Sequence, residues 1–361
     1  MGSSPRPARK CAAGCLALRA TAAAALPLPG RRWAMGGVLV CCQELPLPEA
    51  DADIVWDAPA APDCPAYGFA RAMRRFEAGE VVERSACIVL LRGACRGSLL
   101  DAYCYACPAD GAGSGAKAEN SAFDLSLLPT GWALLFRRCQ DAQANLSMDH
   151  VVEAAHCDGG GQSPPRHWLV FRCSREIAPG DELCVAEGAG AAAPLPPIFE
   201  AAAAAMRRVA GSADQPAICA VDHGSAVRRA WPPRALPSAS SLHGTGAFAA
   251  REVARGEVIE EAPTLPLVFR EIVGTALRDY VFLSSGPQSS GIVLLPLGLG
   301  AVYNHGGAKG NVRPHPCATR PNVWMWTARH RIRKGEEMLI DYGSEYWAAP
   351  WRTTCVVTAR Q

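Results

Sequence analysis

The stretch "LLPLGLGAVYNHGGAKGN" (294–311) changes abruptly from apolar to polar character. Its apolar part ends on Asn304 and His305, and three of the next five residues are glycine. Buried polar side chains are costly unless they are paired, so these two side chains require partners. Glycine is typical of positions where another segment or a ligand approaches the backbone closely. The stretch therefore predicts a polar site at which a partner approaches the backbone closely.

The chain carries a second version of this stretch, "LLPTGWALLFRRCQDAQAN" (127–145), in its N-terminal half. Three further blocks recur in the same order: 68–91 with 246–268, 99–105 with 276–282, and 175–188 with 330–343. Four matching blocks in one order indicate an internal duplication. The predicted organisation is a leader (1–50), a first copy (51–190), an Ala/Pro-rich linker (191–225), a second copy (226–350) and a tail (351–361).

Both copies are expected to be built mainly from β-strands, because short apolar runs bounded by glycine, proline and charged residues are typical of strands. In the second copy such runs are "VIEEA" (258–262), "LGAVY" (299–303), "NVWMWTA" (322–328) and "EMLIDY" (337–342), and a short strand is expected at 226–230. Helical spacing is confined to 269–282 and, in the linker, to 199–209, while 231–241 is interpreted as a low-complexity surface insertion. The fold class is therefore predicted to be mainly β rather than doubly wound α/β.

The composition argues against two classes of partner and against a metal site. The chain has 361 residues with 36 basic and 34 acidic side chains, so no general positive field draws in nucleic acid. No run of 18 or more apolar residues is present, and we therefore predict no membrane-spanning helix. The 16 cysteines are irregularly spaced, and the pair Cys104 and Cys107 lacks a second pair at zinc-site spacing, so no metal site is predicted.

The N-terminal leader has a biased composition. Its first 43 residues contain six Lys or Arg and no acidic residue. This composition is typical of an organelle transit peptide, so a plastid or mitochondrial location is one interpretation. A disordered tail, or translation starting at Met35, is the alternative.

Three polar clusters in the second copy are not required by a β core: Gly244-Thr245-Gly246, Asn304-His305 with Asn311, and Asp341-Tyr342-Gly343. Each cluster alone has a structural explanation, as a tight turn, a satisfied polar pair or a packed aromatic side chain. Their order and spacing, with Tyr280 between the first two, resemble the pattern of the SET-domain protein lysine methyltransferases. Residues 226–350 resemble most closely the short viral SET histone methyltransferases.

The resemblance implies tandem SET-type β-clip folds of small twisted sheets, with a C-terminal pseudoknot in which the final segment threads beneath the loop that follows Asn304. It implies S-adenosylmethionine as the cofactor and a protein substrate with a target lysine, a histone tail being one candidate. A nuclear location follows if the substrate is a histone. By this resemblance, cofactor binding is assigned to Gly244, Thr245, Gly246, Ala247, Asn304, His305, Tyr342 and Trp347, and catalysis to Tyr342 and Tyr280.

The implied reaction is displacement of the sulfonium methyl group by a neutral lysine amine. Free lysine has a pKa of about 10.4, so the amine must lose a proton first. An apolar channel and a nearby positive charge both lower that pKa, so no strong base is required. Three positions depart from the family pattern, namely Thr245, Gly306 and Gly310.

The first copy has lost the residues of the site. Arg137 and Arg138 replace the Asn-His pair, and Glu187 replaces Tyr342. We therefore expect a degenerate copy that either docks on the active one inside a single chain or binds a partner. Two alternatives remain: a catalytically inactive interaction scaffold, and a metal-dependent hydrolase using His305, His315 and Cys317, whose spacing fits no helix face.

Overall fold

The computed structural model describes residues 52–57, 69–91, 98–106, 125–153, 165–186, 195–196, 198–210, 226–283, 291–317, 320 and 323–348. The predicted leader, the tail and much of the linker lie outside these residues, as do Cys107 and Glu187. Within the described part, no helix is both long and apolar enough to cross a membrane.

The first half is built from short strands joined by turns and by 3₁₀ helices at 101–103, 132–135 and 141–143. Its longest strand, β3, is rich in valine and leucine, and its side chains alternate between buried and partly buried from Ala86 to Leu90, as expected of a strand beside a core. The strands are β1 (Ala52–Asp57), β2 (Arg71–Ala72), β3 (Val81–Leu91), β4 (Tyr105–Ala106), β5 (Leu125–Pro129), β6 (Arg137–Cys139), β7 (Leu146–Glu153), β8 (Arg166–Cys173) and β9 (Cys184–Ala186).

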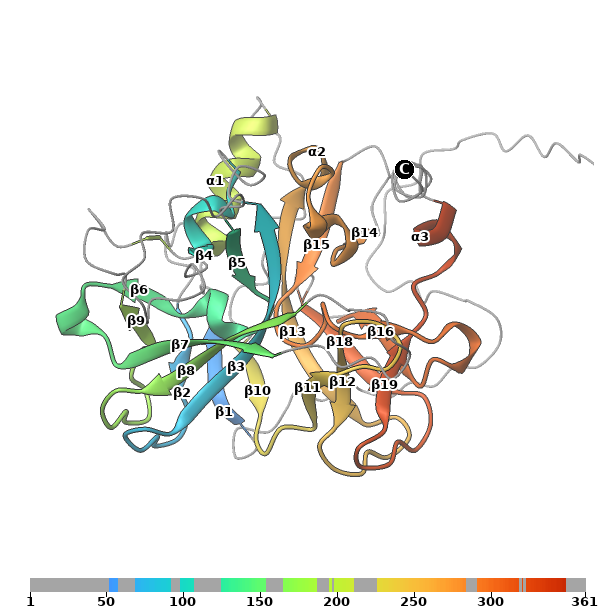
Figure 1. Ribbon diagram of the computed structural model, residues 1–361, viewed down its shortest axis with the longest axis horizontal. Helices are drawn as coiled ribbons and strands as arrows, with labels where there is room; N and C mark the ends of the chain where they lie inside the picture. Colours follow the sequence, from blue (N-terminus) through green and yellow to red (C-terminus); the bar gives the residue numbers. More distant parts are fainter. Residues whose placement is uncertain are drawn as a thin grey trace, which may run out of the picture. The chain divides into compact units, whose positions relative to one another are not determined.

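The second half follows helix α1 (Ile198–Ala210) and is again mainly β (Figure 1). Its strands are β10 (Ala226–Ala230), β11 (Ala235–Ala239), β12 (Thr245–Ala249), β13 (Val258–Val268), β14 (Phe282–Leu283), β15 (Ile292–Pro296), β16 (Asn304–His305), β17 (Val312–Pro316), β18 (Val323–Ala328) and β19 (Glu337–Ile340). Helices α2 (Phe269–Ile272) and α3 (Ser344–Ala348) are short. The mainly β fold class predicted from the sequence is confirmed.

The strand pairings of the first half recur in the second. β3 pairs antiparallel with β5 and β8, and β13 pairs antiparallel with β15 and β18. β6 pairs in parallel with β9, and β16 pairs in parallel with β19. β3 and β13 each carry a register shift near their start, between Val81 and Glu83 and between Val258 and Glu260. The two halves thus share one strand-pairing scheme.

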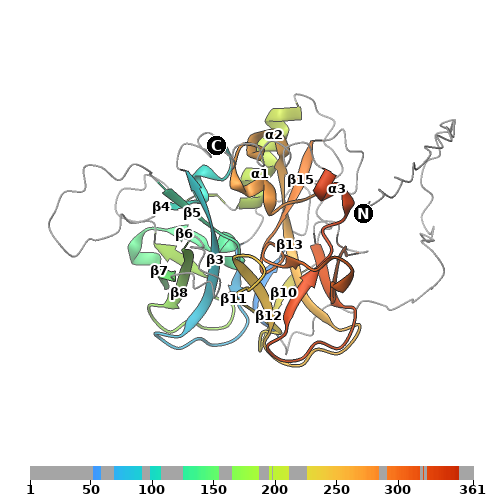
Figure 2. The same cartoon turned by 45° about the vertical axis from the view of Figure 1, so that its right-hand side comes forward.

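The halves also share a hydrophobic core. One cluster of buried side chains contains Trp56 and Phe171 from the first half and Leu265 and Met325 from the second. Strand β1 pairs antiparallel with β10, and Figure 2 shows β10 and β11 at the junction between β3 and the strands of the second half. The described halves therefore form one packed unit.

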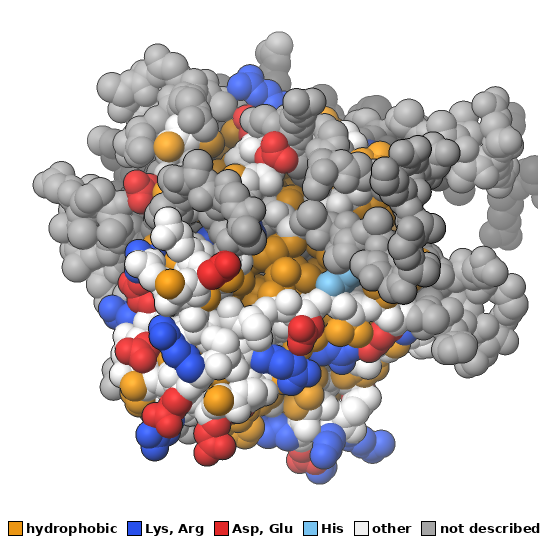
Figure 3. Space-filling view, turned by 60° about the vertical axis from the view of Figure 1, so that its left-hand side comes forward, with side chains coloured by type: hydrophobic (Ala, Val, Ile, Leu, Met, Phe, Trp, Pro, Cys, Tyr) orange, Lys and Arg blue, Asp and Glu red, His pale blue; other side chains and the backbone are white. Residues whose placement is uncertain are grey.

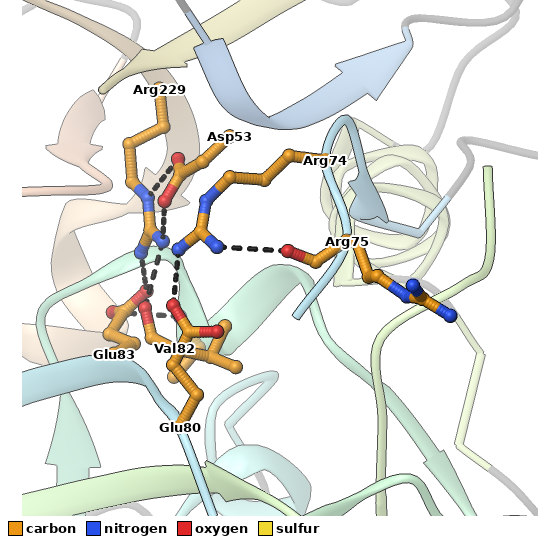
Figure 4. A network of polar contacts seen from close by, with 8 residues as sticks. Asp53, Arg74, Arg75, Glu80, Val82, Glu83 and Arg229 are labelled. Atoms are coloured by element: carbon orange, nitrogen blue, oxygen red, sulfur yellow. Dashed lines mark hydrogen bonds and ion pairs between the residues drawn. The ribbon is translucent and has the colours of Figure 1, made fainter. Parts of the chain in front are cut away.

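Arg229 on β10 joins the halves through a buried ion network (Figure 4). Its guanidinium donates to Asp53 through Nε at 2.9 Å and Nη2 at 2.7 Å, and to Glu83 Oε2 through Nη1 at 3.1 Å. Asp53 is fully buried and Glu83 is nearly so. Burial raises the pKa of Glu83, and the charge of Arg229 opposes that rise. The β1–β10 pairing therefore depends on a cation shared by two buried carboxylates.

Several predicted elements lie where the sequence placed them. β10, β18 and α1 occupy 226–230, 323–328 and 198–210. The segment 269–282, expected to be helical, divides into α2, a 3₁₀ helix at 276–279 and the start of β14, so its helical character is only partial.

Two predictions were wrong. "LGAVY" (299–303) is a turn rather than a strand, because Gly298 has a φ of +99° and the Leu299 N–H donates to Glu260 Oε1 at 2.7 Å. The segment 231–241 is not merely an insertion, since it contains β11, which pairs with β12 at the edge of a four-stranded sheet. An edge strand tolerates Pro237, which lacks a backbone N–H to donate.

Candidate active site

Asn304 at the start of β16 ties three segments together. Its Nδ2 group donates to Glu337 Oε1 at 2.9 Å, to the His243 carbonyl at 3.0 Å and to the Thr245 carbonyl at 3.3 Å. The side chain is buried. The amide nitrogen therefore has the partners that the sequence analysis required, and they are protein groups. Its role is to hold the turn before β12 against β19.

Gly246 allows this close approach. A Cβ at this position would overlap the Glu337 carboxylate and lie 3.1 Å from Asn304 Nδ2. Gly244 precedes it with a φ of +48°, a conformation that favours glycine. Both glycines of the predicted Gly-Thr-Gly turn are thus explained by the path of the backbone.

Gly246→Ala is expected to lower the free energy of unfolding by about 1–3 kcal/mol, because the new methyl group displaces Glu337 and breaks its bond with Asn304. Gly274→Ala is the matched control, since a Cβ there has no neighbour within 4 Å. Urea unfolding of both variants measures the difference. Equal stability of the two variants would contradict the role given to Gly246.

His305 fixes the end of β19. Its Nδ1 accepts a hydrogen bond from the Tyr342 backbone N–H at 3.1 Å and lies 3.8 Å from Asp341 Oδ1. Since Nδ1 accepts, the neutral ring carries its proton on Nε2. The ring lies 5.1 Å from both the Tyr342 and the Trp347 rings, measured between centroids. His305 therefore sets the position at which Tyr342 leaves the sheet.

Tyr342 points its hydroxyl at the segment that precedes β16. The Tyr342 hydroxyl donates to the Tyr303 carbonyl at 2.9 Å. The Tyr346 ring lies edge-on to Tyr342 at 4.5 Å, and the Trp347 ring is stacked at 6.4 Å. Held at its backbone by His305 and at its hydroxyl by Tyr303, Tyr342 has a fixed orientation.

Tyr342 and Tyr280 line a common cavity of about 400 Å³, which we call the tyrosine cavity. Other aromatic side chains of its wall are Phe269, Phe282, Tyr303 and Tyr346. Burial raises the pKa of Tyr280, with a smaller contribution from Asp279, and burial also raises the pKa of Tyr303. These hydroxyls therefore stay protonated at neutral pH, inside a cavity whose wall is mainly apolar.

The predicted site residues fall into two groups. Tyr280 and Tyr342 line the tyrosine cavity, whereas the Gly244–Ala247 turn, Asn304, His305 and Trp347 lie outside its wall. The two groups meet at Tyr342, through its contacts with His305 and Trp347. Trp347 is half exposed beside them, at 52 % of its surface.

Sequence reasoning missed Tyr303 and Phe282. Tyr303 comes directly before Asn304, and it supplies the carbonyl that holds the Tyr342 hydroxyl. As the last residue of an apolar run, it has the pattern of an ordinary core residue. No signal in the sequence distinguished its carbonyl from any other.

Asn311 has the same contacts as its counterpart in the first half. Asn311 accepts from the Leu339 N–H at 2.8 Å and donates to the Glu337 carbonyl at 3.0 Å. Asn145 accepts from the Cys184 N–H at 2.7 Å and donates to the Glu182 carbonyl at 2.8 Å. Because the first half keeps this arrangement although Arg137 and Arg138 stand at the positions of Asn304 and His305, Asn311 is explained by the fold.

The glycines after His305 lie against β19. A Cβ at Gly306 would lie 2.7 Å from Leu339 Cβ, and a Cβ at Gly310 would lie 3.3 Å from the Ile340 carbonyl carbon. These distances are those of two segments in contact, which is what the glycines were expected to permit. The departures from the family pattern at these positions therefore fit the local packing.

In the first half, an ion pair occupies the position that is equivalent to the contact between Asn304 and Glu337. This ion pair joins Arg137 to Glu182 at 3.0 Å. Arg138 lies 4.0 Å over the Tyr105 ring and donates to the Tyr103 carbonyl at 2.5 Å. The positive charges of the two arginines are thus matched by a carboxylate, a carbonyl and an aromatic face.

Neither a strongly charged patch on the face seen in Figure 3 nor a metal site is found among the described residues. On the face seen in Figure 3, basic and acidic side chains are interspersed among the described residues, with no large patch of one sign. Among the described residues, no three His, Cys, Asp or Glu side chains are grouped so that they could hold a metal ion.

Comparison with known proteins gives likenesses among solved structures. No family model and no curated protein matches the chain. A Plasmodium falciparum protein described as a histone methyltransferase is 34% identical, over 32% of this chain and 96% of that chain, with a TM-score of 0.27. The chain is similar to a histone methyltransferase over about a third of its length.

Two further solved structures are Polycomb Repressive Complex 2 assemblies. A humanized mutant of the Chaetomium thermophilum complex is 23% identical, over 30% of this chain and 15% of that chain, with a TM-score of 0.25. An autoinhibited form bound to S-adenosylmethionine is 23% identical, over 36% of this chain and 17% of that chain, with a TM-score of 0.26. The chain spans less than a fifth of the length of these two relatives.

Proposed function

We propose that the protein is an S-adenosylmethionine-dependent protein lysine methyltransferase of the SET type, with catalysis in a second copy at 226–350. The observation that carries the proposal is the fixed Tyr342 side chain, which faces the tyrosine cavity together with Tyr280. Asn304 and His305 place the backbone beside it in the order that the family pattern requires.

The residues around Tyr342 fit a cationic, methyl-bearing cofactor. The rings of His305, Tyr342 and Trp347 lie 5.1–6.4 Å apart, and aromatic faces attract a sulfonium as they attract other cations. The Gly244–Ala247 backbone, Asn304, His305, Tyr342 and Trp347 would hold the cofactor. When bound, S-adenosylmethionine supplies the methyl group.

The chain's own residues prepare the lysine amine. The aromatic wall of the tyrosine cavity desolvates an ammonium group, which lowers the pKa of that group from about 10.4 and favours the neutral amine. The proton leaves to solvent before methyl transfer, so no strong base is needed. The Tyr342 hydroxyl donates to the Tyr303 carbonyl, and this bond fixes the place at which its oxygen would meet the amine. Positioning of this kind can supply on the order of 7–11 kcal/mol.

We also propose that the chain consists of two copies, at 51–190 and 226–350, and that the first is degenerate. The recurring strand pairings and the filled first site support this proposal. A histone is the candidate substrate, with a nuclear location if that holds. The alternative is an inactive scaffold that binds proteins through the same fold.

Incubation of the full chain with labelled S-adenosylmethionine, histones and a cell extract tests the proposal, with methylated lysines read by mass spectrometry. Calorimetry with the unlabelled cofactor supplies the second readout. We expect cofactor binding and label on lysine. Failure to bind the cofactor overturns the enzyme, whereas binding without any labelled lysine favours the scaffold.

Trp347→Ala is expected to weaken cofactor binding about tenfold, because it removes an aromatic face beside Tyr342. Trp231→Ala is the matched control, since Trp231 is similarly exposed but lies at the second cavity described below. Calorimetric titration of both variants gives the ratio. An equal loss of affinity in both variants would refute the assignment of Trp347.

A further inference from the structure

A second cavity of about 400 Å³, which we call the junction cavity, is bordered by both halves of the described chain. Its wall includes Glu83 and Trp132 from the first half and Trp231, Ile259, Glu260 and Leu299 from the second. It has no lining residue in common with the tyrosine cavity. The proposed methyl transfer at the tyrosine cavity therefore gives the junction cavity no role.

Glu83 and Glu260 occupy equivalent positions on β3 and β13, each beside a glycine. A Cβ at Gly131 would overlap the Glu83 carboxylate, and a Cβ at Gly298 would overlap that of Glu260. The two carboxylates thus stand at matching points of the repeated scaffold, and both face the junction cavity.

The carboxylates of Glu83 and Glu260 differ in their hydrogen-bond partners. Glu83 accepts from Arg229 Nη1 at 3.1 Å, from Ser85 Oγ at 2.5 Å and from the Ala133 N–H at 3.1 Å. Glu260 accepts from the Leu299 N–H at 2.7 Å through Oε1, while its Oε2 has no hydrogen-bond partner among the described residues. Arg229 neutralises the first carboxylate, whereas no ion pair joins the second carboxylate to a cation among the described residues.

The surroundings of Glu260 make its charge costly. Burial raises the pKa of Glu260 to about 8, and the nearby charge of Glu83 adds to that rise. The Tyr303 hydroxyl is also buried without a hydrogen-bond partner among the described residues, and the charge of Glu260 adds to the burial that raises its pKa. A positive charge brought to Glu260 would therefore gain more than at an ordinary surface carboxylate.

The remaining charged groups of the cavity wall already have interactions of their own. They are Asp53, Glu83, Arg84, Arg228, Arg229, Arg234 and Glu261. The buried Trp132 Nε1–H, by contrast, has no acceptor among the described residues. A Cβ at Gly298 would lie 3.4 Å from this indole nitrogen, so the Trp132 donor and the Glu260 carboxylate converge on one part of the wall.

We propose that the junction cavity binds an organic molecule with a primary ammonium group, which pairs with Glu260 and lays its apolar chain against Ile259 and Leu299. Oε2 is buried in this structure, so pairing requires the Glu260 carboxylate to turn about its Cγ–Cδ bond, which also moves Oε1 away from the Leu299 N–H. An acceptor group near the amine of the ligand accepts a hydrogen bond from the Trp132 N–H. The amine is either a free alkylamine or a lysine side chain of another protein, which share this chemistry.

Binding releases one proton from the protein below pH 8. Glu260 is mainly protonated there, and it must lose that proton to the buffer to pair with an ammonium. The affinity for an alkylammonium, which keeps its charge up to about pH 10, is expected to rise about tenfold per pH unit up to pH 8 and then to level off.

Calorimetric titration of the full chain with 3-methylbutylamine at pH 6.5, 7.5 and 8.5 tests the proposal, and two buffers of different ionisation enthalpy count the released proton. We expect wild type and Glu252→Gln to bind alike and Glu260→Gln to lose binding. Glu252 is the matched carboxylate, exposed and paired with Arg331 at 2.6 Å away from the cavity. Absence of binding to wild type, or equal binding by Glu260→Gln, overturns the proposal.

The pH series on wild type keeps the test decisive if Glu260→Gln folds poorly, because pH-independent affinity also overturns the pairing. A short peptide with one internal lysine and blocked ends forms the second arm. Loss of its binding in Glu260→Gln assigns the cavity to protein lysines, and binding of the free amine alone assigns it to small molecules. Neither arm requires methyl transfer, so failure here is distinct from failure of the proposed function.

Discussion

Tyr342→Phe is expected to reduce the rate of methyl transfer by about 100-fold or more while leaving the fold intact. The hydroxyl that is lost is the group held by the Tyr303 carbonyl at 2.9 Å, and loss of one positioned polar group in a site typically has an effect of this size. The backbone bond from Tyr342 to His305 Nδ1 is retained, so the end of β19 stays in place. Single-turnover transfer of label to a histone or peptide substrate measures the rate.

Tyr103→Phe is the matched control for this variant. Its hydroxyl also donates to a backbone carbonyl, that of Pro196 at 2.7 Å, but in the first half. Each variant loses one hydrogen bond, worth about 1 kcal/mol of stability. If both retain the wild-type rate within a few-fold, Tyr342 is not a catalytic residue.

Arg229→Met is expected to lower the free energy of unfolding by about 3–5 kcal/mol, because it leaves Asp53 and Glu83 buried without their common cation. Methionine keeps much of the side-chain volume, so lost packing adds little. Equilibrium unfolding in urea at pH 7.5 measures the change. A loss below about 1 kcal/mol would show that water reaches these carboxylates.

The same variant has a defined pH dependence. The pKa of Glu83 is already raised by burial, and removing Arg229 raises it further. The destabilisation is therefore complete above the pKa of Glu83 in the folded variant and shrinks as the pH falls through it. Arg331→Met, which breaks a surface pair with Glu252, is the control and should show little change at any pH.

Local patterns allowed much of the fold to be predicted. The run that became β18, VWMWTA, is rich in aromatic and β-branched residues, so its own composition favours a strand. Gly306 and Gly310 were correctly associated with a crossing, because glycines clustered after a polar pair leave room for a second segment to pass close to the backbone. The duplication predicted the recurrence of pairings, since equivalent sequences meet equivalent partners.

What the sequence did not reveal depends on distant residues. The turn at Leu299 exists because Glu260 on another strand accepts its N–H. Asn304 is satisfied by the His243 and Thr245 carbonyls, and backbone carbonyls leave no trace in a sequence. The β1–β10 pairing between halves is likewise invisible to a comparison that treats each copy alone.

The pairing of β1 with β10 also has a consequence for synthesis. Strand β1 emerges from the ribosome early, but its partner β10 lies about 180 residues later, a delay of roughly ten to forty seconds at common rates of translation. During that time β1 has an unpaired edge, and Asp53 lacks its cation. The nascent first half can therefore complete this pairing only after residues 226–230 are made, and until then the open edge of β1 favours aggregation.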